Sequence, residues 1–200
     1  VGESGSDQVA SSFGSPVLPN TQGHFPLADP GAGAYFQSQL GSSTTVVASD
    51  GFICRFNGAR ELVWNTFFGG VQSDLLTDVS VKEGGVYAVG RTSSNTVNAC
   101  SVNANGNIPL CQTNATAYQQ HFNPNAEPLY FSDLLIASFA SNNALDWSTC
   151  YGANGEEGAF DDIQCVSNAV GELFVLSHSY PITFGTAYNM STLDFTGQYY

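Results

Sequence analysis

Short runs of β-branched and aromatic residues, separated by glycine-containing turns, set the hydrophobic pattern of this chain. Residues 52–56 and 62–68 flank an Asn-Gly pair, and this combination predicts a β-hairpin. Residues 76–81 alternate apolar and polar side chains, pass a Gly-Gly turn and continue as an apolar run over 86–91, which predicts a second hairpin. Because no segment keeps a helical period with caps, we expect an all-β fold with long loops.

The first of these hairpins occurs twice. Residues 50–69 are echoed by residues 133–152 at a constant offset of 83 positions (133 − 50). The second hairpin is echoed by residues 162–166 and 173–178, where the offset drifts because the turn gains residues. Such a repeat makes one copy a structural unit, and function then belongs to the array of units. The identical pairs of the first hairpin are Asp50/Asp133, Ile53/Ile136, Phe56/Phe139, Leu62/Leu145, Trp64/Trp147, Thr66/Thr149 and Gly69/Gly152.

Two long segments, residues 7–49 before the first hairpin and residues 92–132 before its echo, are rich in turn-forming residues, which predicts surface loops. Tyr35 in the first loop and Tyr118 in the second stand at the same offset of 83, so we assign both loops to the repeat. Connections of this length are usually functional or disordered. The first six residues of the chain also resemble the exit from the 86–91 strand, so we expect the chain to open at the end of a strand.

The order of these motifs resembles one known family. The chain contains Asp-Gly-Phe-Ile-Cys-Arg-Phe-Asn at 50–57, Leu-Val-Trp-Asn-Thr-Phe-Phe-Gly-Gly at 62–70 and Val-Tyr-Ala-Val-Gly at 86–90. The loop before the first motif adds Phe-Pro, Pro-Gly and Ala-Tyr pairs. Together they resemble the bacterial β-propeller repeat family often abbreviated SBBP. The departures are loops about twice the usual family length and His178 in place of the Arg91-type strand exit.

The resemblance implies a β-propeller, in which four-stranded antiparallel blades stand around a central axis. It places the innermost strand of one blade at 76–81, the second at 86–91, the third at 134–139 and the outermost at 145–151. A chain of 200 residues is too short to close such a ring at this repeat length, so we expect a partial propeller within a larger protein. The implied organisation is the outer half of one blade at 1–70 with the insertion 7–49, a complete blade at 71–152 with the insertion 92–132, and the inner half of a third blade at 153–200.

Charge excludes some partners. The net charge is −13 and the chain has only four Lys and Arg residues, so nucleic acid is not expected as a partner. No apolar run reaches the length of about 20 residues that spans a bilayer, so membrane insertion is not expected either. We attribute the excess of acidic residues to the solubility that a negative net charge provides, with divalent-cation binding as the alternative. Four acidic residues lie close together in the sequence and could hold Ca²⁺: Glu156, Glu157, Asp161 and Asp162. The glycines among them favour a plain turn instead, so we predict no cofactor.

The five cysteines fall into two groups. Cys100 and Cys111 lie in one loop, so we expect a disulfide between them and an oxidising compartment. Cys54, Cys150 and Cys165 align with apolar strand residues of the other copies, which predicts small buried side chains. The blade assignment puts Cys150 and Cys165 too far apart to bridge.

The repeated aromatic residues are predicted to pack in the hydrophobic core and not to form a ligand site. Trp64, Trp147, Phe56 and Phe139 occupy equivalent positions, and a repeated large aromatic packs between neighbouring blades more often than it stacks on a ligand.

No catalytic arrangement is visible in the sequence. His24, His121 and His178 do not occupy equivalent positions, and no nucleophile motif accompanies them. The candidate contact residues are instead Tyr35, Tyr118 and His121 in the long loops.

The leading hypothesis is therefore a non-enzymatic β-propeller module, secreted by a bacterium or held at its surface, for binding, adhesion or structural assembly. Its expected partners are a protein or glycan surface and further blades. One alternative is a propeller hydrolase or lyase acting on extracellular polysaccharide. Another is a subunit of an extracellular filament or surface layer, whose edge strands pair with other copies.

Overall fold

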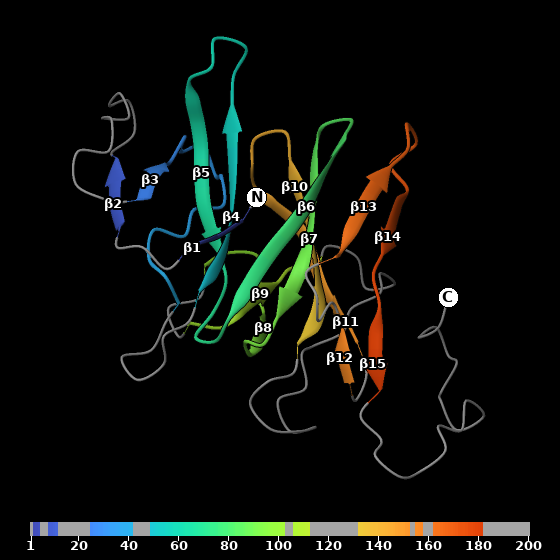
Figure 1. Cartoon of the computed structure of the whole chain (residues 1–200). Helices are drawn as coiled ribbons and strands as arrows, with labels where there is room; N and C mark the ends of the chain where they lie inside the picture. The colour runs from blue at the N-terminus through green and yellow to red at the C-terminus, as the bar shows by residue number, and fades with distance from the viewer. Residues whose placement is uncertain are drawn as a thin grey trace.

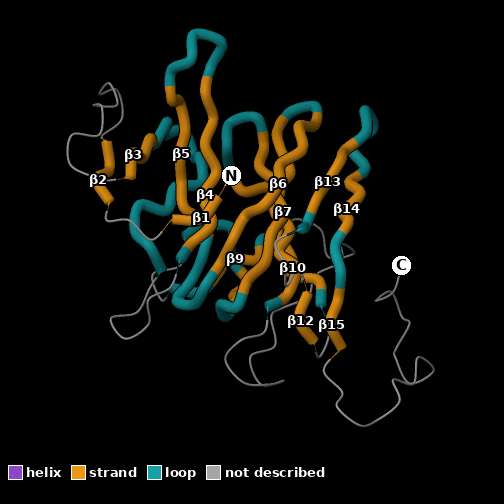
Figure 2. Tube along the Cα trace, in the orientation of Figure 1, coloured by secondary structure: helices purple, strands orange, loops and turns teal. Residues whose placement is uncertain are grey.

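The computed structural model describes residues 2–4, 8–11, 25–41, 49–102, 106–112, 132–152, 155–157 and 162–181. Every regular element in these ranges is a β-strand, and the strands form several sheets (Figure 1). Figure 2 shows the same arrangement with strands and loops alone. The described ranges contain no helix of the length and apolar character that crossing a membrane requires. The all-β prediction is confirmed.

A four-stranded antiparallel sheet forms the middle of the molecule. Its strands are β6 (Asp74–Lys82), β7 (Gly85–Thr92), β10 (Asp133–Ala140) and β11 (Leu145–Tyr151), in the order β11-β10-β7-β6. This is the strand order that the family resemblance implies, and the insertion after residue 92 joins β7 to β10 as expected. Figure 1 shows the turns of its two hairpins at the same end of the molecule.

A five-stranded sheet contains the first copy of the repeated hairpin, β4 (Asp50–Phe56) and β5 (Leu62–Phe68). Its other strands are β1 (Gly2–Ser4) beside β4, and β3 (Phe25–Ala28) and β2 (Gln8–Ser11) beyond β5. The segment 7–49 is thus not loop throughout, because it supplies these last two strands.

The register of the two sheets repeats. Gly2 pairs with Phe52 in the first sheet as Gly90 pairs with Leu135 in the second. Strand β1 therefore occupies, in the first sheet, the place that the end of β7 occupies in the second.

A third hairpin lies beside β6. It comprises β13 (Gln164–Ser167) and β14 (Leu173–Leu176). Two small pairs complete the described strands: β8 (Thr96–Asn98) lies parallel to β9 (Ile108–Leu110), and β12 (Gly155–Glu157) lies antiparallel to β15 (Ser179–Pro181).

The main core fills the space between the first two sheets. Trp64 packs edge-on against Phe139 with ring centroids 5.2 Å apart, and Phe68 also contacts that ring. The insertions contribute as well, because Tyr35 and Ile108 are buried in this cluster. Tyr35 is therefore a core residue, and its prediction as a ligand contact is wrong. The sequence pattern missed it because burial here comes from a neighbouring sheet.

Two of the four predicted core aromatics differ from expectation. Trp64 and Phe139 are fully buried, but Phe56 is 59% exposed and Trp147 is only half-buried. Phe139 is covered by Trp64 of the preceding unit, whereas no sheet within the described ranges covers the equivalent ring of Phe56.

Candidate functional site

A groove separates β4 from β6 at the turn end of the molecule. The two strands approach closely at their other end, where a Cβ added to Gly51 would lie 2.7 Å from the Leu76 side chain. Toward the turns they diverge, and the space between them has a volume of about 500 Å³. The residues of β4 from Ile53 to Phe56 form one wall, β6 and β7 form the other, and the β10–β11 turn closes the floor. We call this space the β4 groove.

The walls of the β4 groove are largely apolar. Phe56, Val79 and Val81 line it and are exposed, with Val81 at 76%. Trp64 and Val86 lie deeper. Exposed apolar side chains gathered in one concave place mark a contact surface more often than isolated ones do.

Two cations border the β4 groove, and both are held by the protein itself. The Arg55 Nη1 atom donates hydrogen bonds to the Ser141 carbonyl and to Asn143 Oδ1, each at 3.1 Å. Lys82 Nζ lies 2.6 Å from Ser138 Oγ and 3.3 Å from Asp146 Oδ2. Because these groups already engage the cations, the groove is better suited to an apolar partner than to an anion.

The backbone edge of β4 also borders the groove. Strand β1 pairs only with residues 50–52 of β4, and no described residue pairs with Ile53–Phe56 on that side. An unpaired strand edge presents a row of N–H and C=O groups that accepts another strand. Within the part of the chain that the structure describes, the groove therefore combines apolar walls with a stretch of strand edge that no other strand pairs.

Two buried carboxyl groups lie at the closed end of the sheets. Asp50 Oδ2 accepts hydrogen bonds from Gln37 Nε2 at 2.7 Å and from the Gly41 backbone N–H at 2.9 Å. Asp74 Oδ2 accepts from the Gly70 N–H at 2.6 Å and from Ser94 Oγ at 2.7 Å. These bonds fix the Gly69-Gly70 turn and the two loops around it.

Burial governs the ionisation of both carboxyl groups. Burial, aided by the negative charge of Asp74, raises the pKa of Asp50 to about 7 although two hydrogen bonds oppose the change. Burial likewise raises the pKa of Asp74 to about 6 against its own hydrogen bonds. Neither residue lines the β4 groove. The sequence signal for this network was present in the identical pair Asp50/Asp133 and in Gln37, which recurs as Gln120.

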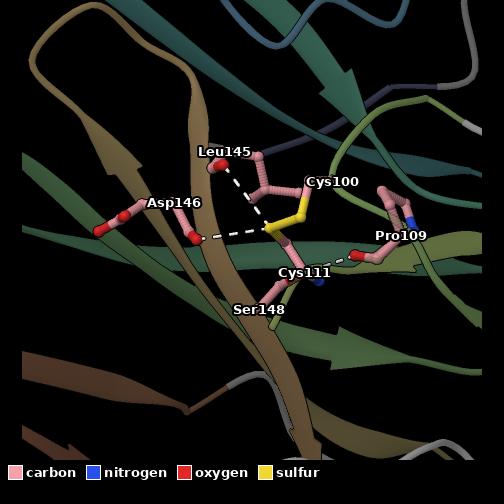
Figure 3. Close-up of a disulfide and its surroundings, with 6 residues drawn as sticks. All are labelled: Cys100, Pro109, Cys111, Leu145, Asp146 and Ser148. Carbon is pink, nitrogen blue, oxygen red and sulfur yellow. Dashed lines mark hydrogen bonds between the residues drawn. A yellow bond between two sulfur atoms is a disulfide. The ribbon is translucent and has the colours of Figure 1, made fainter. Parts of the chain in front are cut away.

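The predicted disulfide is confirmed. Cys100 and Cys111 are bonded, and Figure 3 shows the bond against β11. The Cys111 N–H donates to Ser148 Oγ at 2.9 Å, and that hydroxyl donates to the Pro109 carbonyl at 2.8 Å. These hydrogen bonds fasten the end of β9 to β11, and the disulfide ties the segment after β8 to the segment after β9. The disulfide indicates an oxidising environment.

The other three cysteines carry thiols. Cys150 is fully buried as predicted, whereas Cys54 and Cys165 are only partly buried. Burial, with the nearby charge of Asp78, raises the pKa of Cys165 to about 11, so this thiol stays protonated at neutral pH.

The predicted acidic cluster is described only in part. Asp162 Oδ1 lies 2.7 Å from His178 Nδ1, so the partner of this carboxylate is a histidine side chain. The backbones of Glu156 and Glu157 lie in β12, but their side chains and Asp161 fall outside the described residues. Within the described ranges, no three His, Cys, Asp or Glu side chains come together as a metal site. The candidate contacts Tyr118 and His121, together with His24, also fall outside these ranges.

No protein-family model matches the sequence, and no curated protein shows significant similarity to it.

Proposed function

We propose that this chain is part of an extracellular β-propeller and serves as a non-enzymatic module for binding or assembly. Its contact site is the β4 groove.

The propeller arrangement is supported by the way the repeat units meet. Strand β13 lies beside β6, as the innermost strands of adjacent blades do. Thr77 Oγ1 donates to the Ile163 carbonyl at 2.9 Å, and the Cys165 N–H donates to Asp78 Oδ2 at 2.8 Å. These bonds join successive repeat units along β6, the strand that the proposal places next to the propeller axis.

The single observation that carries the binding role is the β4 groove itself, a concave space lined by the exposed side chains of Phe56, Val79 and Val81. A protein segment can bind in such a space by placing its own apolar side chains against these walls. A protein segment fits this site better than a glycan because the walls offer apolar contact and the cations are already engaged. Catalysis on polysaccharide would need carboxyl groups in the groove, and Asp50 and Asp74 are buried away from it.

A selection from a displayed library of 15-residue peptides tests this role. We expect enriched peptides with alternating apolar residues, and we expect them to protect the backbone amides of residues 53–56 from hydrogen exchange. A matched variant, Val81→Glu, should weaken binding by placing a charge in the groove, whereas Val170→Glu at an exposed turn should not. Peptides that protect only other segments, or release of reducing sugar from a polysaccharide panel, would overturn the proposal.

A further inference from the structure

We infer that Asn57 is a site of spontaneous modification, at which this chain converts its own asparagine into a mixture of aspartate and isoaspartate. The reactants are the side-chain amide of Asn57, the backbone nitrogen of Gly58 and water. No binding partner takes part, so the reaction is independent of the proposed binding role. Two observations support it, the structure of the β4–β5 turn and a second turn that provides an internal control.

The reaction is an attack on the Asn57 side chain by the backbone of the next residue. The Gly58 nitrogen gives its proton to a solvent base and forms a bond to Asn57 Cγ. The bond from Cγ to Nδ2 breaks, and the leaving nitrogen takes a proton from water and departs as ammonia. Water then opens the cyclic imide at either carbonyl carbon. One opening leaves aspartate, and the other leaves isoaspartate, in which the main chain runs through the former side chain.

The attacking nitrogen is accessible in this structure. Asn57 and Gly58 are exposed at the tip of the β4–β5 hairpin, which extends to the top of the molecule in Figure 1. Among the described residues, no hydrogen-bond acceptor engages the Gly58 N–H. A Cβ added to Gly58 would have no atom within 4 Å apart from its neighbours in the chain. Because glycine has the greatest backbone freedom of all residues, its nitrogen can approach Cγ at little cost.

The same turn polarises the side-chain amide. Asn57 Oδ1 accepts hydrogen bonds from the Ala59 N–H at 2.9 Å and from the Glu61 N–H at 3.0 Å. The attack places negative charge on this oxygen, and backbone N–H donors aimed at such an oxygen stabilise that charge. Asn57 Nδ2 donates to Glu61 Oε2 at 2.7 Å. The amide is therefore held in one orientation, with its carbonyl oxygen between two donors.

A second turn has the same hydrogen bonds but a different following residue. Asn168 Oδ1 accepts from the Val170 N–H at 3.1 Å and from the Glu172 N–H at 2.9 Å, and Asn168 Nδ2 donates to Glu172 Oε2. The backbones match as well, since in each turn the Asn N–H donates to the carbonyl of the Glu that ends the turn. The residue after Asn168 is Ala169, whose Cβ restricts the backbone. This turn therefore keeps the arrangement and lacks the glycine.

The products would alter the rim of the β4 groove. Phe56, which lines the groove, directly precedes residue 57. Aspartate loses the Nδ2 donor and sets a second carboxylate beside Glu61, so an attraction becomes a repulsion between like charges. Isoaspartate adds a CH₂ group to the main chain, so the bonds between residues 57 and 61 cannot all be kept. The rim would thus gain negative charge and change shape as the protein ages.

Peptide mapping of the aged, folded chain tests the inference. Trypsin cleaves after Arg55 and Arg60 and so releases residues 56–60 as one peptide. At neutral pH we expect both aspartate and isoaspartate to accumulate in this peptide, whereas direct hydrolysis of the amide would give aspartate alone. Conversion at Asn168 should be on the order of tenfold slower. An unchanged Asn57, or slower conversion than in the same chain unfolded in urea, would overturn the inference.

Exchanging the residues that follow the two asparagines gives matched controls. Gly58→Ala should slow conversion at Asn57 on the order of tenfold, and Ala169→Gly should accelerate conversion at Asn168 by a similar factor. Both positions are exposed, so both variants should keep the wild-type fold, which urea unfolding checks. Equal rates at Asn57 with and without Gly58 would exclude the backbone attack. No gain at Asn168 in Ala169→Gly would show that this turn blocks the attack, and either result would overturn the inference.

Discussion

Replacing Asp50 by Asn should remove a large part of the pH dependence of stability. Asp50 is buried, and burial raises its pKa to about 7 in the native state from 3.8. A native pKa above the unfolded value means that the folded chain holds the proton more tightly. The stabilisation from this proton is fully present below pH 3.8 and is lost as the pH rises toward 7.

The size of the effect follows from the same values. Each pKa unit corresponds to about 1.4 kcal/mol, so the difference between the two states amounts to on the order of 4 kcal/mol. Asn keeps a carbonyl oxygen that accepts the bonds from Gln37 and Gly41 but has no proton to lose. The new amide can also change the unfolding free energy by an amount that does not depend on pH. This amount cancels when the difference between variant and wild type is compared at several pH values.

Urea unfolding at pH 4, 5, 6, 7 and 8 measures this effect. The unfolding free energy of Asp50→Asn minus that of the wild type should become more positive by about 4 kcal/mol between pH 4 and pH 8. The control Glu83→Gln, at an exposed turn, should keep a difference constant to within about 0.5 kcal/mol. A constant difference for Asp50→Asn would refute the argument that burial sets the ionisation of this carboxyl group.

Three further outcomes are expected from thermal or urea unfolding. Replacing both Cys100 and Cys111 by Ser removes a disulfide that spans 11 residues and should lower the unfolding free energy by about 3 kcal/mol. A reductant should lower the unfolding free energy of the wild type by the same amount and should not change that of the variant. Gly69→Ala should destabilise by about 1–3 kcal/mol because its Cβ would meet a buried carboxyl carbon at 2.5 Å, whereas Gly58→Ala, with open space around it, should change stability by less than about 0.5 kcal/mol. Phe139→Ala should cost about 3–5 kcal/mol because the ring is fully buried, and a loss below about 1 kcal/mol would contradict its place in the core.

The local sequence predicted the strands because their signals are local. Alternation of side chains and the Asn-Gly and Gly-Gly turns depend on neighbouring residues alone. The constant offset predicted that the two copies of the first hairpin form equivalent strand pairs, and the family resemblance implied the strand order that the four-stranded sheet shows. The disulfide was predictable for a similar reason, because its two cysteines lie in one insertion.

Only the tertiary structure decided which of these residues are buried. Phe56 and Phe139 occupy equivalent positions of the repeat, yet one is exposed and the other is fully buried, because among the described strands only those of the first sheet pack over Phe139 and none packs over Phe56. Tyr35 belongs to a loop by pattern but is part of the core, and Asp50 looks like an ordinary strand start but is a buried acid. Burial depends on neighbours that are distant in sequence. The β4 groove follows from the same cause, since none of the described strands fills the space between β4 and β6.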